Sequence, residues 1–216
     1  MFLSYHSSDR ALAGNIKLNL RHYGLDVFLA HEDIAPTEEW QTRILSELKR
    51  AAVFLPLLTD KFITSKWTAQ ECGIAVARGT FIISLKVTID PFGFLAKNQA
   101  LNFRKDNLAR SCFGIAKAIY RNPMLQRRFL DGLIDSVRRS GNFEEAIKRT
   151  SLVNEFSGYN RRQVNEVMMA AIDNPQLHNS FGARRRLDAF IKKNTGKADK
   201  ALLKGYAEKV ADSRRT

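Results

Sequence analysis

The chain is poor in the residues that would cross-link it or hold a metal. It has two cysteines, Cys72 and Cys112, without the CxxC spacing or the neighbouring histidines of a metal site. Both lie in apolar stretches with helical character, which favours two reduced thiols inside a core over a disulfide framework. The four histidines are scattered along the chain. The sequence therefore predicts no metal site.

Long hydrophobic runs are also missing. The first apolar run, Met1–Leu3, is far too short for a signal peptide, and no later run approaches the roughly 20 residues of a membrane-spanning helix. We therefore expect a cytoplasmic protein with no membrane partner. The hydrophobic content of 44% is ordinary for a folded protein, so a buried core is expected.

Positive charge is abundant but unevenly distributed. The formal net charge is +13. Residues 1–103 carry 11 Lys and Arg against 10 Asp and Glu, whereas residues 104–216 carry 24 against 12. A change of composition of this kind indicates a domain boundary, and we predict domains at 1–120 and 121–216.

The first half alternates short apolar runs with amphipathic stretches. Strands are predicted at 2–5, 26–29, 52–58, 80–85 and 100–103, and helices at 12–23, 37–48 and 66–78. Thr37 is the expected N-cap of the second helix, and Pro56 is expected to mark a bulge or a strand end. This order is typical of an α/β protein. Right-handed crossovers then give a flavodoxin-like doubly wound parallel sheet.

The second half has no long β-type run and is predicted to be an all-α C-terminal domain. Its helices are expected at about 106–120, 123–140, 143–156, 160–173, 178–194 and 197–212. Its excess of Lys and Arg makes nucleic acid one candidate partner of residues 121–216. A solvated basic surface, a surface facing an acidic protein, and a sensor or assembly domain are the alternatives.

A tryptophan and a carboxylate lie four residues apart near the start of the third predicted helix. Trp67 and Glu71 would share one face of that helix, so an aromatic surface and an acid would look into the same space. Such a pair suits a ligand with a ring and sugar hydroxyls. Tyr5, His6 and the loop at 30–37 follow other strands and fall at the same edge of the sheet, where doubly wound folds bind their ligands.

These segments together resemble a bacterial Toll/interleukin-1 receptor (TIR) domain over roughly residues 1–120. The motifs that carry the resemblance are Phe2-Leu3-Ser4-Tyr5, Gly24-Leu25-Asp26-Val27-Phe28, Asp33-Ile34-Ala35-Pro36 followed by Trp40, and Ser65-Lys66-Trp67 with Glu71-Cys72-Gly73-Ile74-Ala75. The order and spacing of the four motifs make the likeness specific. It does not extend to the remaining helices.

The resemblance implies an NAD+-cleaving enzyme whose catalytic residue is Glu71. By the same resemblance, Tyr5, Phe28, Trp40 and Trp67 line the nucleotide cleft. NAD+ is then the substrate, and no separate cofactor is implied. Family members often carry basic residues in the loop after the first strand, where this chain reads His6-Ser7-Ser8-Asp9-Arg10. Which group meets the diphosphate stays open, with Arg10 and Lys66 as the candidates.

Cleavage of the nicotinamide–ribose bond passes through an oxocarbenium-like transition state, which one carboxylate can stabilise or attack. Water as the acceptor gives ADP-ribose, and an internal group of the substrate gives a cyclic isomer; the sequence does not choose between them. In the resembling family both products serve antiviral defence signalling. Self-association, with a loop such as 31–40 completing a neighbour's cleft, and an effector or trigger protein are the partners implied.

Two other classes of function compete with the enzymatic interpretation. One is a TIR module that assembles without catalysis. The other is an enzyme resembling nucleoside deoxyribosyltransferases, which share the sheet and use a glutamate at the sugar. A phosphorelay receiver is disfavoured because no aspartate ends the third strand, where Leu58 and Thr59 stand.

Overall fold

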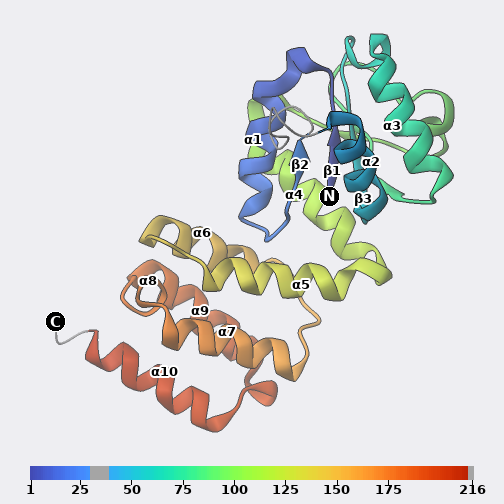
Figure 1. Cartoon of the computed structure of the whole chain (residues 1–216). Coiled ribbons are helices and arrows are strands. Elements are labelled where there is room, and N and C mark those ends of the chain that lie inside the picture. The colour runs from blue at the N-terminus through green and yellow to red at the C-terminus, as the bar shows by residue number, and fades with distance from the viewer. Residues whose placement is uncertain (30–38, 214–216) are drawn as a thin grey trace. The chain divides into compact units, whose positions relative to one another are not determined.

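A computed structural model of the chain describes residues 1–29 and 39–213. The chain divides into two compact units (Figure 1). The first unit consists of Met1–Arg21 and Asp26–Ile119, and the second of His22–Leu25 and Tyr120–Thr216. Cys72 and Cys112 are free thiols in the first unit.

The first unit is built on a parallel sheet whose strand order is β2-β1-β3-β5-β6, with β4 also paired to β3. The strands are β1 (Phe2–Ser4), β2 (Phe28–Leu29), β3 (Val53–Leu58), β4 (Phe81–Ile82), β5 (Leu85–Lys86) and β6 (Leu101–Asn102). All the pairs are parallel. The prediction of a doubly wound α/β sheet is therefore confirmed.

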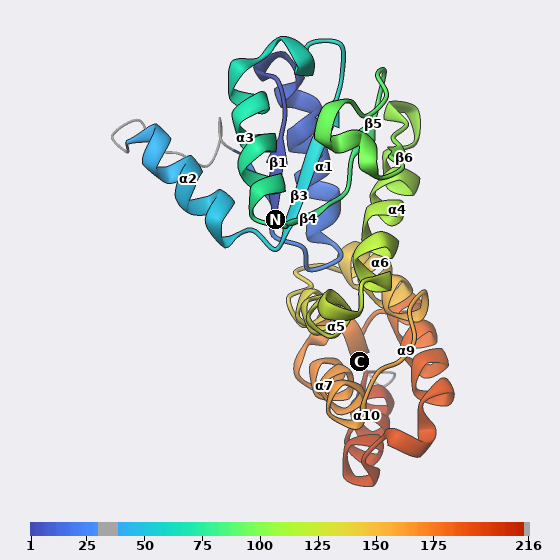
Figure 2. The same cartoon turned by 90° about the vertical axis from the view of Figure 1, so that its right-hand side faces the viewer.

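Helices cover both faces of this sheet. They are α1 (Arg10–Arg21), α2 (Trp40–Arg50), α3 (Lys66–Ala77) and α4 (Leu108–Arg121). In both views α2 and α3 lie on one side of β1 and β3, and α1 and α4 lie on the other (Figures 1 and 2). The amphipathic patterns of α1, α2 and α4 favour this arrangement, since each of these helices buries a mostly apolar face. Helix α3 differs, because its buried residues are Thr68, Glu71 and Ala75.

The register of β1 decides which of its side chains face α2 and α3. Phe2 belongs to a core cluster with Phe54 of β3 and with Ile44, Leu48 and Ala75 of the two helices. Successive residues of a strand point to opposite faces. Ser4 therefore shares the face of Phe2 and points toward α3. A small polar residue thus lies at the carboxyl end of an otherwise apolar strand face.

Pro56 lies inside β3, opposite Ser4 of β1, and accounts for a break in the next strand. The carbonyl of Phe54 accepts the N–H of Ile83, so Pro56, two residues on, turns its backbone nitrogen to the same neighbour. Proline has no N–H to donate to a ladder. The single strand predicted at 80–85 is accordingly split into β4 and β5. The expected irregularity is present, but in the neighbouring strand.

Helix α2 begins later than the sequence indicated. Its N-cap is Glu39, whose side chain makes no capping hydrogen bond, and Trp40 is its first helical residue. The Glu39 carboxylate accepts instead from the Thr42 hydroxyl at 2.8 Å. The predicted cap, Thr37, lies outside the described residues, as does most of the predicted 31–40 loop. Placing Trp40 at the helix start keeps its ring at the carboxyl end of the sheet.

The second unit is helical, as predicted for this part of the chain. Its helices are α5 (Pro123–Arg138), α6 (Phe143–Asn154), α7 (Arg161–Asp173), α8 (Pro175–His178), α9 (Phe181–Lys193) and α10 (Lys200–Asp212). Four of the five long helices carry an Asn or Ser N-cap whose side chain accepts a backbone N–H, and Asp199 serves α10 in the same way.

A close backbone contact ties the segment His22–Leu25 into this second unit. Gly24 has a φ of 68°, a left-handed conformation, and a Cβ on it would lie 1.8 Å from the carbonyl oxygen of Gly132 in α5. The carbonyl of His22 also accepts the hydroxyl of Ser136 at 3.0 Å. Glycine is required at residue 24 both for its φ and for this approach.

Candidate active site

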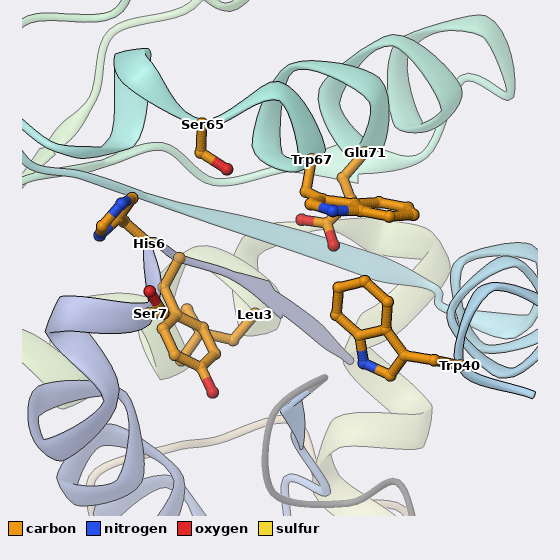
Figure 3. A pocket seen from close by; sticks show the side chains of 8 residues that line it. Leu3, His6, Ser7, Trp40, Ser65, Trp67 and Glu71 are labelled. Carbon is orange, nitrogen blue, oxygen red and sulfur yellow. The ribbon is translucent and has the colours of Figure 1, made fainter. Parts of the chain in front are cut away.

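Helix α3 is anchored so that two of its side chains turn toward the sheet. The Ser65 hydroxyl accepts the N–H of Thr68 at 3.3 Å, which fixes the helix start at Lys66. The Thr68 hydroxyl donates to the Phe62 carbonyl at 2.6 Å. Trp67 and Glu71, one turn apart, then project from the same face of the helix (Figure 3).

Glu71 is a buried acid, with only 6% of its surface exposed. The hydroxyl of Ser4, itself 1% exposed, donates a hydrogen bond of 2.5 Å to one carboxylate oxygen. Burial raises the pKa of Glu71 to about 7, and the Ser4 hydrogen bond partly opposes that rise. Near neutral pH the group therefore exists in both its charged and its neutral form.

Two indole rings adjoin this carboxyl group. Trp40 and Trp67 meet edge to face, with ring centroids 4.6 Å apart and planes at 75°. Figure 3 shows the Glu71 carboxyl group beneath the ring of Trp67, on the side that faces Trp40. Among the residues that the structure describes, ring surface and the Ser4 hydroxyl, rather than a counter-charge, adjoin the charged form of the acid.

A cavity of about 130 Å³ opens beside the acid, at the carboxyl end of the parallel strands. Its lining combines rings, hydroxyls and one carboxylate, from Leu3, Tyr5, His6, Ser7, Trp40, Ser65, Trp67 and Glu71. Among the residues 1–29 and 39–213, no lysine or arginine lines it. We refer to it as the polar cavity.

A second cavity of about 150 Å³ lies between α2 and α3 and shares Trp67 and Glu71 with the first. Its remaining lining is mostly aliphatic, with two amides, and consists of Gln41, Ile44, Leu45, Leu48, Gln70 and Ile74. We refer to it as the apolar cavity. A dry cavity of about this volume accommodates a single six-membered ring. Glu71 thus borders a polar space and a ring-sized apolar space.

The structure brings four of the predicted site residues together and leaves three outside. Tyr5, Trp40, Trp67 and Glu71 all line the polar cavity. Phe28 does not line either cavity: its ring packs 5.4 Å from that of Phe2, and the Arg43 guanidinium lies 5.9 Å above it. It is a half-buried side chain packed against the core cluster of Phe2.

The two predicted phosphate contacts also fall outside the cavities. Arg10 and Lys66 are the first residues of α1 and α3, and both are exposed. Neither lines the polar cavity or the apolar cavity. Both had been candidates because of charge and sequence position alone, which do not fix the direction of a long side chain at a helix start.

The sequence had placed His6 at the ligand edge of the sheet without giving it a role, and it had not predicted Ser4, Ser7 and Ser65 as site residues. His6 Nδ1 accepts the N–H of Ser8 at 3.1 Å, so a neutral ring carries its proton on Nε2. The loop after β1 is further held by a hydrogen bond of 2.6 Å from the Thr59 hydroxyl to the Asp9 carboxylate. Their place directly after a buried strand was the only sequence signal for His6 and Ser7.

No group of three or more His, Cys, Asp and Glu side chains suited to a metal ion occurs within the described part of the chain. A search of the same residues finds no helix long and apolar enough to cross a membrane.

The fold and the site together define a class of protein. A doubly wound parallel sheet with rings and an acid at its carboxyl edge is typical of nucleotide-binding α/β domains. The model of the TIR domain family matches residues 1–113, and the chain belongs to this family. TIR domains act in signalling and can have NAD+ nucleosidase activity, and they typically self-associate. A search of curated proteins finds no match to the chain.

Proposed function

We propose that the chain cleaves NAD+ at the bond between nicotinamide and ribose, with Glu71 as the catalytic residue. The observation that carries the proposal is a single buried carboxyl group, bonded to Ser4, that borders both a polar and a ring-sized apolar cavity. Membership of the TIR family supports it, because members of that family include NAD+ nucleosidases.

The chemistry requires one carboxylate and no acid. Nicotinamide leaves as a neutral molecule, so its departure needs no protonation, while positive charge develops on the ribose ring. A carboxylate beside C1′ stabilises this charge, or attacks C1′ as the bond to nicotinamide breaks. The resulting ester is then displaced from C1′ by water or by another group of the substrate, which regenerates the carboxylate. The stabilisation is large because Glu71 lies among apolar groups, where the local dielectric is low.

The two cavities divide the substrate between them in this proposal. The apolar cavity takes the nicotinamide ring against Trp67, with the amides of Gln41 and Gln70 available for its carboxamide. The polar cavity takes the ribose, and the path toward the diphosphate passes His6 and Ser7. The Nε2–H of His6 and the serine hydroxyl are hydrogen-bond donors that suit anionic oxygens. They replace Arg10 and Lys66 as the proposed diphosphate contacts.

Water and the substrate's own groups both remain acceptors for the ribose, so the product is ADP-ribose or a cyclic isomer. NAD+ is a cytoplasmic metabolite, and we place the reaction in the cytoplasm. Its role is proposed to be antiviral defence signalling, through NAD+ depletion or a nucleotide signal. Self-association through the TIR unit is proposed to switch the activity on.

The decisive experiment compares Glu71→Gln with Glu47→Gln in the purified full chain. Nicotinamide and ADP-ribose products are separated by chromatography after incubation with NAD+. Loss of a transition-state electrostatic partner lowers the rate by about 10²–10³. Glu47 pairs with Arg43 on α2 and lines neither cavity, so its variant should retain full activity. Retention of most NAD+ cleavage by Glu71→Gln would overturn the proposal.

A second candidate function is a TIR module that assembles without catalysis. The observation that favours it is the polar cavity's lack of a cationic side chain among the described residues, since diphosphates usually meet Lys or Arg. Complete absence of nicotinamide release at every protein concentration would decide for this module. Membership of the TIR family argues against the deoxyribosyltransferase alternative.

A further inference from the structure

The second unit has an open groove between α9 and α10, with a volume of about 510 Å³. It is lined by Asp188, Ile191, Lys192 and Thr195 of the α9 side and by Leu203, Tyr206, Ala207, Val210 and Ala211 of α10. It is distant in sequence from the site described above and is not used by the proposed reaction.

Two side-chain hydrogen bonds link α9 to α10 and to the residue that follows α10. The Tyr206 hydroxyl donates to the Asp188 carboxylate at 3.1 Å, and the Arg184 guanidinium donates to the Ser213 hydroxyl at 2.6 Å. Helix α10 packs on α7 instead, where a Cβ on Gly205 would lie 3.4 Å from Ile172. The groove is therefore already formed in the chain without a partner.

The surface of the groove suits an apolar helix face. The aliphatic floor of the groove consists of three half-buried side chains, Ile191, Leu203 and Val210. Ala207 and Ala211 lie one turn apart on α10 and are exposed, so the α10 side of the groove is lined by small side chains. Small residues on one wall allow another helix to approach closely enough for its larger side chains to fill the groove.

The charge of the walls identifies the complementary partner. Helix α9 carries five Lys and Arg against one acid, and α10 carries three Lys against two acids. The one acid of α9, Asp188, already accepts the Tyr206 hydroxyl. Lys192 lines the groove, and Arg185 lies two turns before it on the same face of α9. The basic flank is therefore that of α9, since Lys204 of α10 pairs with Glu208. An apolar floor with a basic flank complements a helix that is apolar on one side and acidic on the other.

We propose that the groove between α9 and α10 is a docking site for an acidic amphipathic helix of a partner protein. Helix-in-groove recognition reads apolar anchors at i, i+3, i+4 and i+7, while charge complementarity sets partner choice and association rate. Nucleic acid fits the observations less well. Single strands need exposed aromatic platforms, and Tyr206, the one ring in the lining, is buried and bonded to Asp188.

The test uses the full chain and designed peptides of about 18 residues, long enough to form a helix with four anchors. A labelled peptide with Leu at the anchor positions and Glu elsewhere on the helix is titrated with the protein, and fluorescence anisotropy is recorded. Two matched peptides replace Leu by Ser, or Glu by Lys. A single-stranded oligonucleotide of similar charge is the fourth ligand. We expect binding of the Leu–Glu peptide alone among the peptides.

Variants locate the binding site. Ala207→Trp fills the groove from an exposed position and should raise the Kd of the Leu–Glu peptide by at least about tenfold. Ala189→Trp is the matched control, because Ala189 is an exposed alanine of α9 that does not line the groove. Lys192→Glu should weaken binding as well, and most strongly at low salt. Thermal unfolding of each variant checks that the second unit remains folded.

The outcomes are decisive. A peptide Kd that rises by the same factor in Ala189→Trp and Ala207→Trp, or that neither variant raises, overturns the proposal, as does equal binding of the Leu-to-Ser peptide. No binding of the Leu–Glu peptide overturns it too. Binding of the oligonucleotide that is lost in Ala207→Trp assigns the groove to nucleic acid instead. None of these results depends on NAD+ cleavage.

Discussion

Glu71 should affect the stability of the fold as well as its chemistry. Its pKa is about 7 in the folded chain against 4.5 for an ordinary glutamate, so the folded state binds more protons between these values. The free energy of unfolding therefore falls as the pH rises from about 4.5 to above 7, by about 3 kcal/mol in total. Glutamine at this position stays neutral and avoids that loss.

We accordingly expect Glu71→Gln to be more stable than the native chain at pH 8 by about 3 kcal/mol, with the difference vanishing near pH 4.5. Urea unfolding at several pH values measures it, with Glu47→Gln as the control for loss of a carboxylate. If Glu71→Gln were less stable than the native chain at pH 8, the contacts of the charged carboxylate would contribute more to stability than its burial costs.

In the proposed reaction, Ser4 would act through Glu71 as a positioning residue. Its hydroxyl favours the charged carboxylate, so Ser4→Ala should raise the pKa of Glu71 further. We expect the acid limb of the pH profile of kcat/KM to move to higher pH in Ser4→Ala. The variant should then be less active than the native chain at neutral pH and regain its activity at higher pH. A purely structural role would lower kcat/KM equally at every pH, which is the contrary result to look for.

The sequence predicted those site residues that a helix or strand period places. Trp67 and Glu71 share a helix face because of their spacing, and Tyr5 follows a strand whose end is at the ligand edge. Phe28 was expected to line the cleft, whereas in the structure its ring packs on that of Phe2 and lines neither cavity, which its sequence position does not reveal. The bond from Ser4 to Glu71 joins residues 67 apart, and no local pattern predicts such a contact.

At the scale of elements, two glycines give opposite predictions. Gly73 is exposed in α3, and a Cβ there meets nothing within 4 Å. Gly73→Ala should raise the free energy of unfolding by about 1 kcal/mol, because alanine restricts the unfolded backbone and favours the helix. Urea unfolding of the full chain measures it. A destabilised variant would indicate a contact of this helix face that the structure does not contain.

Gly24 should tolerate no side chain. Alanine would place its Cβ 1.8 Å from the Gly132 carbonyl and keep an unfavourable φ of 68°. We expect Gly24→Ala to lower the free energy of unfolding by about 2 kcal/mol or more. Gly196→Ala is the control, since a Cβ there is in open space and the backbone is not left-handed. Equal stability of the two variants would contradict the close approach of Gly24 and Gly132.

The order of helices and strands was predictable because it depends on local patterns, namely hydrophobic periodicity and turn residues. The sequence indicated the strands, their parallel arrangement and all the long helices of both halves. What it left open was pairing across the sheet. The split of 80–85 into β4 and β5 follows from Pro56 in a strand distant in sequence, so it could not be located before the register of β3 was known.

At the scale of the whole molecule, the proposal makes activity depend on self-association. TIR domains typically self-associate, and a constantly active monomer would deplete cellular NAD+. We expect the specific activity to rise steeply with protein concentration, because a bimolecular step limits the active form. Nicotinamide release measured across a wide dilution series tests this. A constant specific activity over the whole series would assign the reaction to the monomer.

The burial of Glu71 has a consequence for a cell in which the proposed reaction runs. Hydrolysis of each NAD+ liberates one hydrogen ion. Because the pKa of Glu71 is about 7, acidification of the medium protonates this carboxylate. The neutral form cannot stabilise the transition state, so turnover should slow as the pH falls. In a poorly buffered compartment, the protons released by the proposed reaction would therefore inhibit it.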